Sequence, residues 1–150
     1  MNVERSILLV EDNPSDVELT RRALAKGSLT LRLIVAEDGQ EALDYLLGTG
    51  SHQGRDACKV PSLVLLDIKL PRVDGLTVLE RVRSDPRTRR VPIVIMTSSN
   101  EHRDVSRGYD LGANGYIRKP VDFDRFAEVM EQLGLYWLVV NEPPPEVQLP

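Results

Sequence analysis

Residues 7–14 read Ile-Leu-Leu-Val-Glu-Asp-Asn-Pro, so that an apolar run passes directly into two acids, an asparagine and a proline. A short run without alternating polar residues is typical of a strand buried on both faces, as in a parallel sheet. Asn13 is a residue type that caps helices, and Pro14 suits a first helical position because its missing N–H would have no partner there. This stretch therefore predicts a buried strand, an acidic edge and a helix start.

Four further apolar runs follow along the chain, at residues 31–35, 63–66, 93–96 and, more weakly, 116–117. Between them apolar residues recur at helical spacing, within residues 42–47, 76–82 and 123–133. Regular alternation of strands and helices predicts a doubly wound (βα)5 α/β fold, in which helices cover both faces of a parallel sheet. Residues 101–110 contain few apolar side chains, so we expect them to form the least firmly packed helix.

The composition is that of one ordinary globular domain of 150 residues, 41% of them hydrophobic and 28% charged. We expect a single domain over residues 1–150, with a core at about 6–135 and a tail at 136–150 that is first apolar and then proline-rich. The prolines at 143–145 exclude further helix in that part of the tail.

Charge and cysteine content exclude several classes of protein. With 19 basic and 23 acidic residues the net charge is −4, which argues against direct binding of nucleic acid. No apolar run approaches the roughly 18 residues of a membrane span. The single cysteine, Cys58, cannot form an internal disulfide, so a soluble protein of the reducing cytoplasm is expected.

Residues able to carry chemistry lie just past the ends of four of the five predicted strands: Glu11 and Asp12 follow the first, Asp67 the third, Thr97 the fourth and Lys119 the fifth. The carboxyl ends of parallel strands meet at one edge of the sheet, where ligands bind in this class of fold. Carboxylates gathered there repel one another unless a cation joins them, and oxygen ligands favour Mg²⁺. A Mg²⁺ site of this kind is suited to phosphoryl chemistry.

Short motifs surround these strand ends. They are residues 10–13 (Val-Glu-Asp-Asn), 66–71 (Leu-Asp-Ile-Lys-Leu-Pro), 74–75 (Asp-Gly), 96–98 (Met-Thr-Ser) and 116–120 (Tyr-Ile-Arg-Lys-Pro). Together they resemble the receiver domain of two-component response regulators, and they occur in that family's order between about residues 7 and 135. The resemblance implies the flavodoxin-like receiver fold, with five parallel strands in the order 2-1-3-4-5.

The resemblance also implies roles for the residues at this edge. Asp67 would accept a phosphoryl group from a phosphohistidine of a sensor kinase, while Thr97 and Lys119 would bind the phosphoryl oxygens. A receiver catalyses only its own phosphorylation and dephosphorylation, so the chain is not expected to be a conventional enzyme. Mg²⁺ is the expected cofactor, for which Mn²⁺ or Ca²⁺ could substitute in a crystal. Its expected ligands are the carboxylates of Asp12 and Asp67, the backbone carbonyl of Lys69 and, through water, Glu11.

A conformational switch is implied as well. The ring of Tyr116 would move when the Thr97 hydroxyl turns toward the phosphoryl group, which would change the surface around the fourth helix and fifth strand. A cis peptide bond is expected between Lys119 and Pro120, where it would aim the lysine inward.

The sequence departs from the family pattern in details. Glu11 stands where aspartate is commoner, so its longer side chain is expected to meet the metal differently. Lys69 and Ser99 lie two residues beyond Asp67 and Thr97, where side chains control the access of water to the acyl phosphate. We therefore expect a phosphoryl lifetime different from that of receivers with amide and acidic residues at these positions.

The long polar loop at residues 49–61 and the ending Tyr136-Trp137 resemble response regulators that pair with phytochrome-type histidine kinases. This resemblance implies a light signal and a homodimer formed through the fourth helix, the fifth strand and the fifth helix, together with the C-terminal tail. We expect a stand-alone receiver that acts by protein contact, on a histidine phosphotransfer protein or another protein target.

Three other functions are compatible with this fold class. A phosphatase of the haloacid-dehalogenase type needs a second acid two residues after Asp67, where this chain has Lys69. In a flavodoxin-like electron carrier, acids after the first strand would repel the phosphate of FMN. A receiver-like interaction module that is not phosphorylated is the closer alternative, and it is expected to lack the acceptor aspartate, the metal-binding acid or the lysine.

Overall fold

A computed structural model describes residues 5–26, 30–99, 101–120 and 122–147. Its strands are β1 (Ser6–Val10), β2 (Arg32–Ala36), β3 (Leu63–Leu66), β4 (Ile93–Thr97) and β5 (Gly115–Arg118). Its α-helices are α1 (Pro14–Ala25), α2 (Gly39–Leu47), α3 (Gly75–Ser84), α4 (His102–Asp110) and α5 (Phe123–Leu135). Strand and helix alternate along the chain, as predicted.

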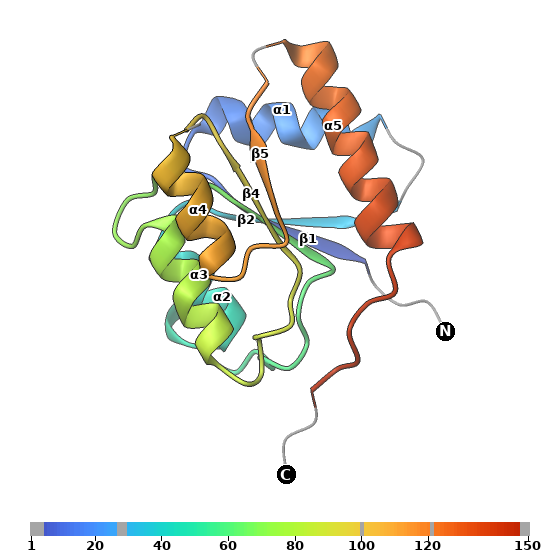
Figure 1. Cartoon of the computed structure of the whole chain (residues 1–150). Coiled ribbons are helices and arrows are strands. Elements are labelled where there is room, and N and C mark those ends of the chain that lie inside the picture. The colour runs from blue at the N-terminus through green and yellow to red at the C-terminus, as the bar shows by residue number, and fades with distance from the viewer. Residues whose placement is uncertain (1–4, 27–29, 100, 121, 148–150) are drawn as a thin grey trace.

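The strands form one parallel sheet in the order β2-β1-β3-β4-β5 (Figure 1). Leu8 in β1 lies opposite Ile34 of β2 on one side and Val64 of β3 on the other. β1 is therefore an interior strand, which explains why its run is apolar without interruption. The predicted doubly wound sheet and its strand order are confirmed.

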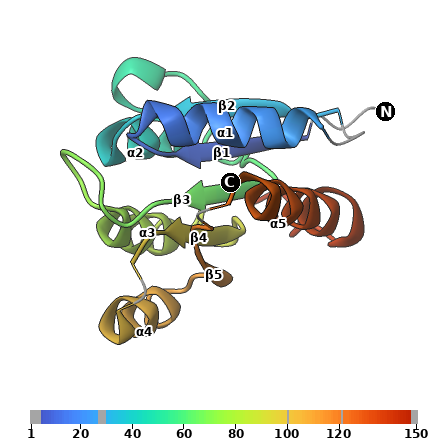
Figure 2. The ribbon, with the colours of Figure 1, turned by 90° about the horizontal axis from the view of Figure 1, so that it is seen from above.

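Helices cover both faces of the sheet, with α1 and α5 packed side by side on one face and α2, α3 and α4 on the other (Figures 1 and 2). Successive side chains of a strand point to opposite faces. Accordingly, Leu8 and Val10 enter the core beneath α2 and α3, whereas Ile7 and Leu9 enter the core beneath α1 and α5.

The predicted helix boundaries follow from local chemistry. The side chain of Asn13 accepts a hydrogen bond from the backbone N–H of Ser15 at 2.9 Å, and Pro14 is the first residue of α1. Gly48 ends α2 in the left-handed conformation, at a φ of 70° that glycine adopts without strain. Within α4 only Gly108 is buried, which confirms that this helix is weakly packed.

The first part of the predicted C-terminal tail is helical. α5 continues into a π-helical segment, Tyr136–Val140, in which Leu138 is buried in the core beneath α1 and α5. The core therefore extends beyond its predicted end at about residue 135, because Leu138 and Trp137 have apolar partners there. Residues 148–150 of the predicted tail lie outside the described residues. Along the described ranges, no helix is long and apolar enough to cross a membrane.

Gly75 provides a test of how closely α3 approaches the end of β3. A Cβ atom at this position would lie 2.0 Å from the carbonyl oxygen of Asp67 and 2.8 Å from Cα of Ile68. We expect Gly75→Ala to lower the free energy of unfolding by about 1–3 kcal/mol, since backbone atoms must shift to make room.

Urea denaturation measures this loss. Gly115→Ala is the control, because its Cβ would meet Val94 at an ordinary 3.6 Å. A Gly75→Ala protein as stable as the wild type would contradict the close approach.

Candidate functional site

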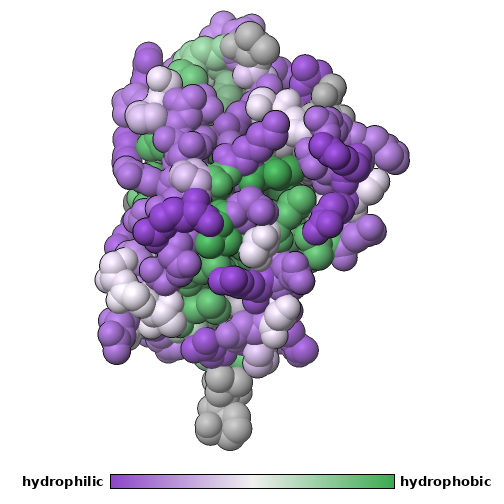
Figure 3. Space-filling view, turned by 90° about the vertical axis from the view of Figure 1, so that its left-hand side faces the viewer, coloured by the Kyte–Doolittle hydropathy of each residue, from purple (hydrophilic) through white to green (hydrophobic). Residues whose placement is uncertain are grey.

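The parallel sheet brings the predicted site residues to one edge. Glu11 and Asp12 directly follow β1, Asp67 follows β3, Thr97 ends β4 and Lys119 follows β5. Backbone hydrogen bonds fix these positions: the Asp67 N–H donates to the Val10 carbonyl at 3.2 Å, and the Lys119 N–H donates to the Thr97 carbonyl at 2.8 Å. Figure 3 shows the side of the molecule toward which the strands run, where hydrophilic residues dominate the surface.

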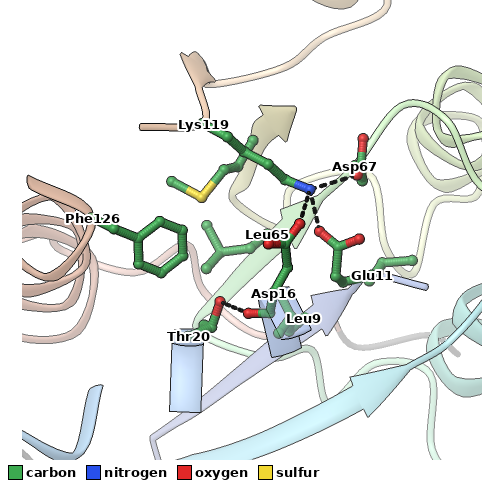
Figure 4. Close-up of a pocket in the computed structure, with 10 residues that line it drawn as sticks. Leu9, Glu11, Asp16, Thr20, Leu65, Asp67, Lys119 and Phe126 are labelled. Carbon is green, nitrogen blue, oxygen red and sulfur yellow. Dashed lines mark hydrogen bonds and ion pairs between the residues drawn. The ribbon is translucent and has the colours of Figure 1, made fainter. Parts of the chain in front are cut away.

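The ammonium group of Lys119 lies among three carboxylates (Figure 4). Nζ is 2.9 Å from an oxygen of Asp67 and 2.9 Å from an oxygen of Asp16, and it forms a short contact with Glu11. The Lys119 side chain is only 15% exposed. Burial lowers the pKa of Lys119, but the bonds to these carboxylates outweigh it, so that its pKa lies above the usual value.

Asp16 was not predicted as a site residue. It lies in the first turn of α1, where an acid ordinarily favours the positive end of the helix dipole. That common role gave no reason to single it out. The relevant signal is topological, because α1 begins at the same edge of the sheet at which β1 ends.

Asp67 is a buried carboxylate with donors to both of its oxygens. Thr97 donates its hydroxyl hydrogen to Oδ1 at 2.8 Å, and the backbone N–H of Lys69 donates to the same oxygen at 3.3 Å. Lys119 donates to Oδ2. Thr97 and Asp67 are 1% and 8% exposed, so this contact is sheltered from bulk water.

Glu11 is more buried than Asp67, at 3% exposure. Its Oε2 accepts a hydrogen bond from the Asn13 N–H at 3.2 Å, while Oε1 accepts from Lys119. Burial raises the pKa of Glu11, and the bond to Lys119 opposes that rise. The bond to Lys119 therefore favours the charged form of Glu11, against the effect of burial.

Glu11, Asp12 and Asp67 form a group suited to a metal ion. One oxygen from each lies within 4.8 Å of the others, and Asp12 is exposed, which leaves the group open to solvent. Carboxylate oxygens are ligands that hard divalent cations such as Mg²⁺ prefer. The donor set thus fits the predicted metal, with Glu11 shared between this group and Lys119.

Tyr116 and Ser99 connect this edge to α4. The Tyr116 hydroxyl donates to the backbone carbonyl of Ser99 at 2.9 Å, and the Ser99 hydroxyl donates to Asp104 of α4 at 2.6 Å. The Ser99 N–H faces the Thr97 hydroxyl at the long distance of 3.5 Å. Burial raises the pKa of Tyr116. The link from Ser99 to Asp104 was not predicted, and no sequence motif indicates it.

The predicted cis bond between Lys119 and Pro120 is wrong: the described peptide bonds contain no cis bond. The backbone bond from Lys119 to Thr97 fixes the start of the side chain beside β4. From there Nζ reaches Asp67 and Glu11, and the peptide bond between Lys119 and Pro120 is trans. A cis bond is therefore not needed to aim the lysine inward.

Comparison with known proteins decides the family. The family model for the response regulator receiver domain matches residues 7–131. The chain belongs to the response regulator receiver family. The probable methanogenesis regulatory protein FilR2 from Methanothrix harundinacea is 38% identical to this chain. The match covers 92% of this chain and 86% of FilR2. The response regulator Rcp1 from Synechocystis is 31% identical over 91% of both chains.

Solved structures of receivers resemble the whole chain. The phosphorylated cyanobacterial phytochrome response regulator RcpA is 33% identical, with a TM-score of 0.88 over 95% of this chain and all of its own. The Mn²⁺-bound form of Rcp1 is 30% identical, with a TM-score of 0.85. The match covers 94% of this chain and 99% of the Rcp1 chain. The bacteriophytochrome response regulator AtBRR is 49% identical, with a TM-score of 0.74. The match covers 94% of this chain and all of the AtBRR chain. The chain is thus homologous to phytochrome-associated receivers.

Lys119 provides a test of charge balance at the site. Lys119→Gln removes the cation beside buried Glu11, and we expect it to lower the free energy of unfolding by about 2 kcal/mol in the presence of a chelator. Mg²⁺ should restore part of this loss, because a divalent cation can neutralise the same carboxylates.

Urea denaturation with chelator and with Mg²⁺ measures both effects. Lys59→Gln, at an exposed position in the 49–61 loop, is the control. It should leave the free energy of unfolding unchanged both with chelator and with Mg²⁺. An equal loss for Lys119→Gln with and without Mg²⁺ would contradict the expectation that the metal can replace the ammonium charge beside these carboxylates.

Proposed function

We propose that this receiver accepts a phosphoryl group on Asp67 from a phosphohistidine of a sensor kinase, with Mg²⁺ as the cofactor. One observation carries the proposal: the buried Asp67 carboxylate lies between the Thr97 hydroxyl and the Lys119 ammonium, beside the acids Glu11 and Asp12. This arrangement supplies a nucleophile, donors for phosphoryl oxygens and ligands for a cation. The Mn²⁺-bound form of Rcp1 supports a divalent metal at the acidic group.

In the proposed transfer, an oxygen of Asp67 attacks phosphorus while the phosphorus–nitrogen bond of phosphohistidine breaks, and the imidazole leaves. Charge on the equatorial oxygens is stabilised by the Lys119 ammonium and the Thr97 hydroxyl. Mg²⁺, when bound, neutralises the carboxylates that would otherwise repel the phosphoryl group. Its proposed ligands are Asp12, Asp67, the backbone carbonyl of Lys69 and, through water, Glu11.

The same contacts suggest how phosphorylation is read out. The Thr97 hydroxyl is bonded to Asp67, so a phosphoryl group at Asp67 offers it a new acceptor. We propose that its movement is followed by the ring of Tyr116, which is bonded to Ser99 in the adjacent loop. Lys69 and Ser99 are proposed to tune the phosphoryl lifetime.

The proposed upstream partner is a phytochrome-type histidine kinase, and the signal is light. Likeness to the phytochrome response regulator RcpA and to the bacteriophytochrome response regulator AtBRR supports this assignment. Output is by protein contact in the cytoplasm, to a histidine phosphotransfer protein or another protein target. The alternative of a non-phosphorylated interaction module is not favoured, because Asp12, Asp67 and Lys119 are all present at one edge of the sheet.

The acceptor is tested by incubating the protein with acetyl phosphate and Mg²⁺ and measuring the intact mass. We expect a gain of about 80 Da, one phosphoryl group, that disappears with a chelator. Asp67→Asn should show no gain, whereas Asp74→Asn, which alters the cap of α3, should be labelled like the wild type. Labelling of Asp67→Asn would contradict the assignment, as would failure of the wild type with both this donor and a phosphorylated histidine kinase.

We further propose a homodimer through α4, β5 and α5 with the C-terminal segment. Large apolar side chains are exposed at Tyr109 of α4 and, at the end of α5 and in the segment after it, at Leu135, Tyr136, Val139 and Val140. Exposed apolar side chains gathered on adjacent turns of a helix favour association.

Sedimentation velocity tests the homodimer. The wild type should sediment as a dimer and the double variant Val139→Asp, Val140→Asp as a monomer, since buried charges oppose the interface. Gln53→Asp, at an exposed position in the 49–61 loop, should leave the dimer intact. A wild type that stays monomeric with and without acetyl phosphate would contradict the dimer.

A further inference from the structure

Asp16 contacts the site without belonging to the metal-binding group. Its Oδ2 lies 2.9 Å from Lys119 Nζ, and its side chain is 27% exposed. Figure 4 shows its carboxylate reaching up from α1 to the lysine, on a side of Nζ away from Asp67. The group formed by Glu11, Asp12 and Asp67 does not include it.

A role in starting α1 does not account for this carboxylate. The helix is capped by Asn13, whose side chain accepts from the Ser15 N–H. Within the described residues, the carboxylate of Asp16 has one hydrogen-bonding partner, which is Lys119. The side chain thus serves the lysine, although a favourable interaction with the helix dipole also exists.

Each hydrogen-bond donor of the Lys119 ammonium group has a partner. An ammonium group has three N–H donors, and Glu11, Asp16 and Asp67 accept one each. A phosphoryl oxygen on Asp67 can therefore bind Lys119 only if one of these acceptors gives way. Asp16 adds a negative charge next to Lys119, although it is neither the proposed phosphoryl acceptor nor a member of the metal-binding group.

We propose that Asp16 is a positioning residue that competes with the phosphoryl group for the ammonium of Lys119. It retains the lysine in the unphosphorylated protein and weakens the binding of the phosphoryl group, through competition for the donor and through repulsion. This inference rests on the proposed function of Asp67 and Lys119. It identifies a residue that sets how readily the site accepts phosphate.

The first test measures the affinity for beryllofluoride, a phosphoryl mimic, by calorimetric titration at saturating Mg²⁺. Asp16→Asn should bind it about threefold to tenfold more tightly than the wild type, because a competing charge beside Lys119 is removed. Glu18→Gln removes the same charge from an exposed position on the same helix and should leave the affinity unchanged. Asp16→Glu, which retains the charge, should stay close to the wild type.

The second test is independent of metal and phosphoryl binding. In metal-free protein labelled with ¹⁵N-lysine, the ammonium protons of Lys119 should exchange with solvent more slowly than those of exposed lysines. Asp16→Asn should speed this exchange and Glu18→Gln should not, because of these two residues it is Asp16 that is bonded to Nζ, while Glu18 is exposed. A purely structural role for Asp16 would alter the urea midpoint without these changes.

The outcomes separate the two proposals. Unchanged or weaker beryllofluoride binding by Asp16→Asn, or unchanged exchange at Lys119, overturns the role of Asp16 while the acceptor site stands. A wild type that neither binds beryllofluoride nor gains a phosphoryl group overturns the proposed function, and the inference with it.

Discussion

The ammonium group of Lys119 balances carboxylates that the fold forces together. Five parallel strands end at one edge, so Glu11 and Asp67 must lie near each other, and α1 adds Asp16. Without a cation, such a group would be destabilised by repulsion and by burial. One lysine after β5 removes much of that cost, yet it leaves the site negative enough to attract a metal ion. The same residue thus stabilises the sheet edge and, in the proposed function, binds the phosphoryl oxygens.

The contacts around Asp67 give the proposed switch a bonded route to the surface of α4. Thr97 is bonded to Asp67, and the next loop is held by Tyr116 and by Asp104 of α4. α4 has little buried surface of its own, and its Gly108 lies against Ile95 and the ring of Tyr116. A helix held by so few contacts can shift at low energetic cost. The α-helix nearest to the proposed switch is therefore also the one with the fewest buried residues.

Much of this architecture could be predicted from the sequence, because buried strands and helix caps leave strong local patterns. The run 7–10 with Asn13 and Pro14 is an example: periodicity located the strand, and capping chemistry located the helix. The acids at strand ends could be predicted to converge from topology alone. The bond from Asp16 to Lys119 could not, since it joins residues 103 positions apart and depends on side-chain reach. The helical continuation through Leu138 depends likewise on tertiary packing, and the trans bond before Pro120 on how the end of β5 is held.

The most direct test of this account is a crystal structure with Mg²⁺ and beryllofluoride bound. We expect the mimic on an oxygen of Asp67, with Lys119 Nζ and the Thr97 hydroxyl bonded to its fluorines and Mg²⁺ among the acidic side chains. Lys119 would then have exchanged one of its carboxylate partners for the mimic. A structure in which the mimic is bound elsewhere, or in which Lys119 keeps all three carboxylates while Asp67 is modified, would contradict the central role given to this lysine.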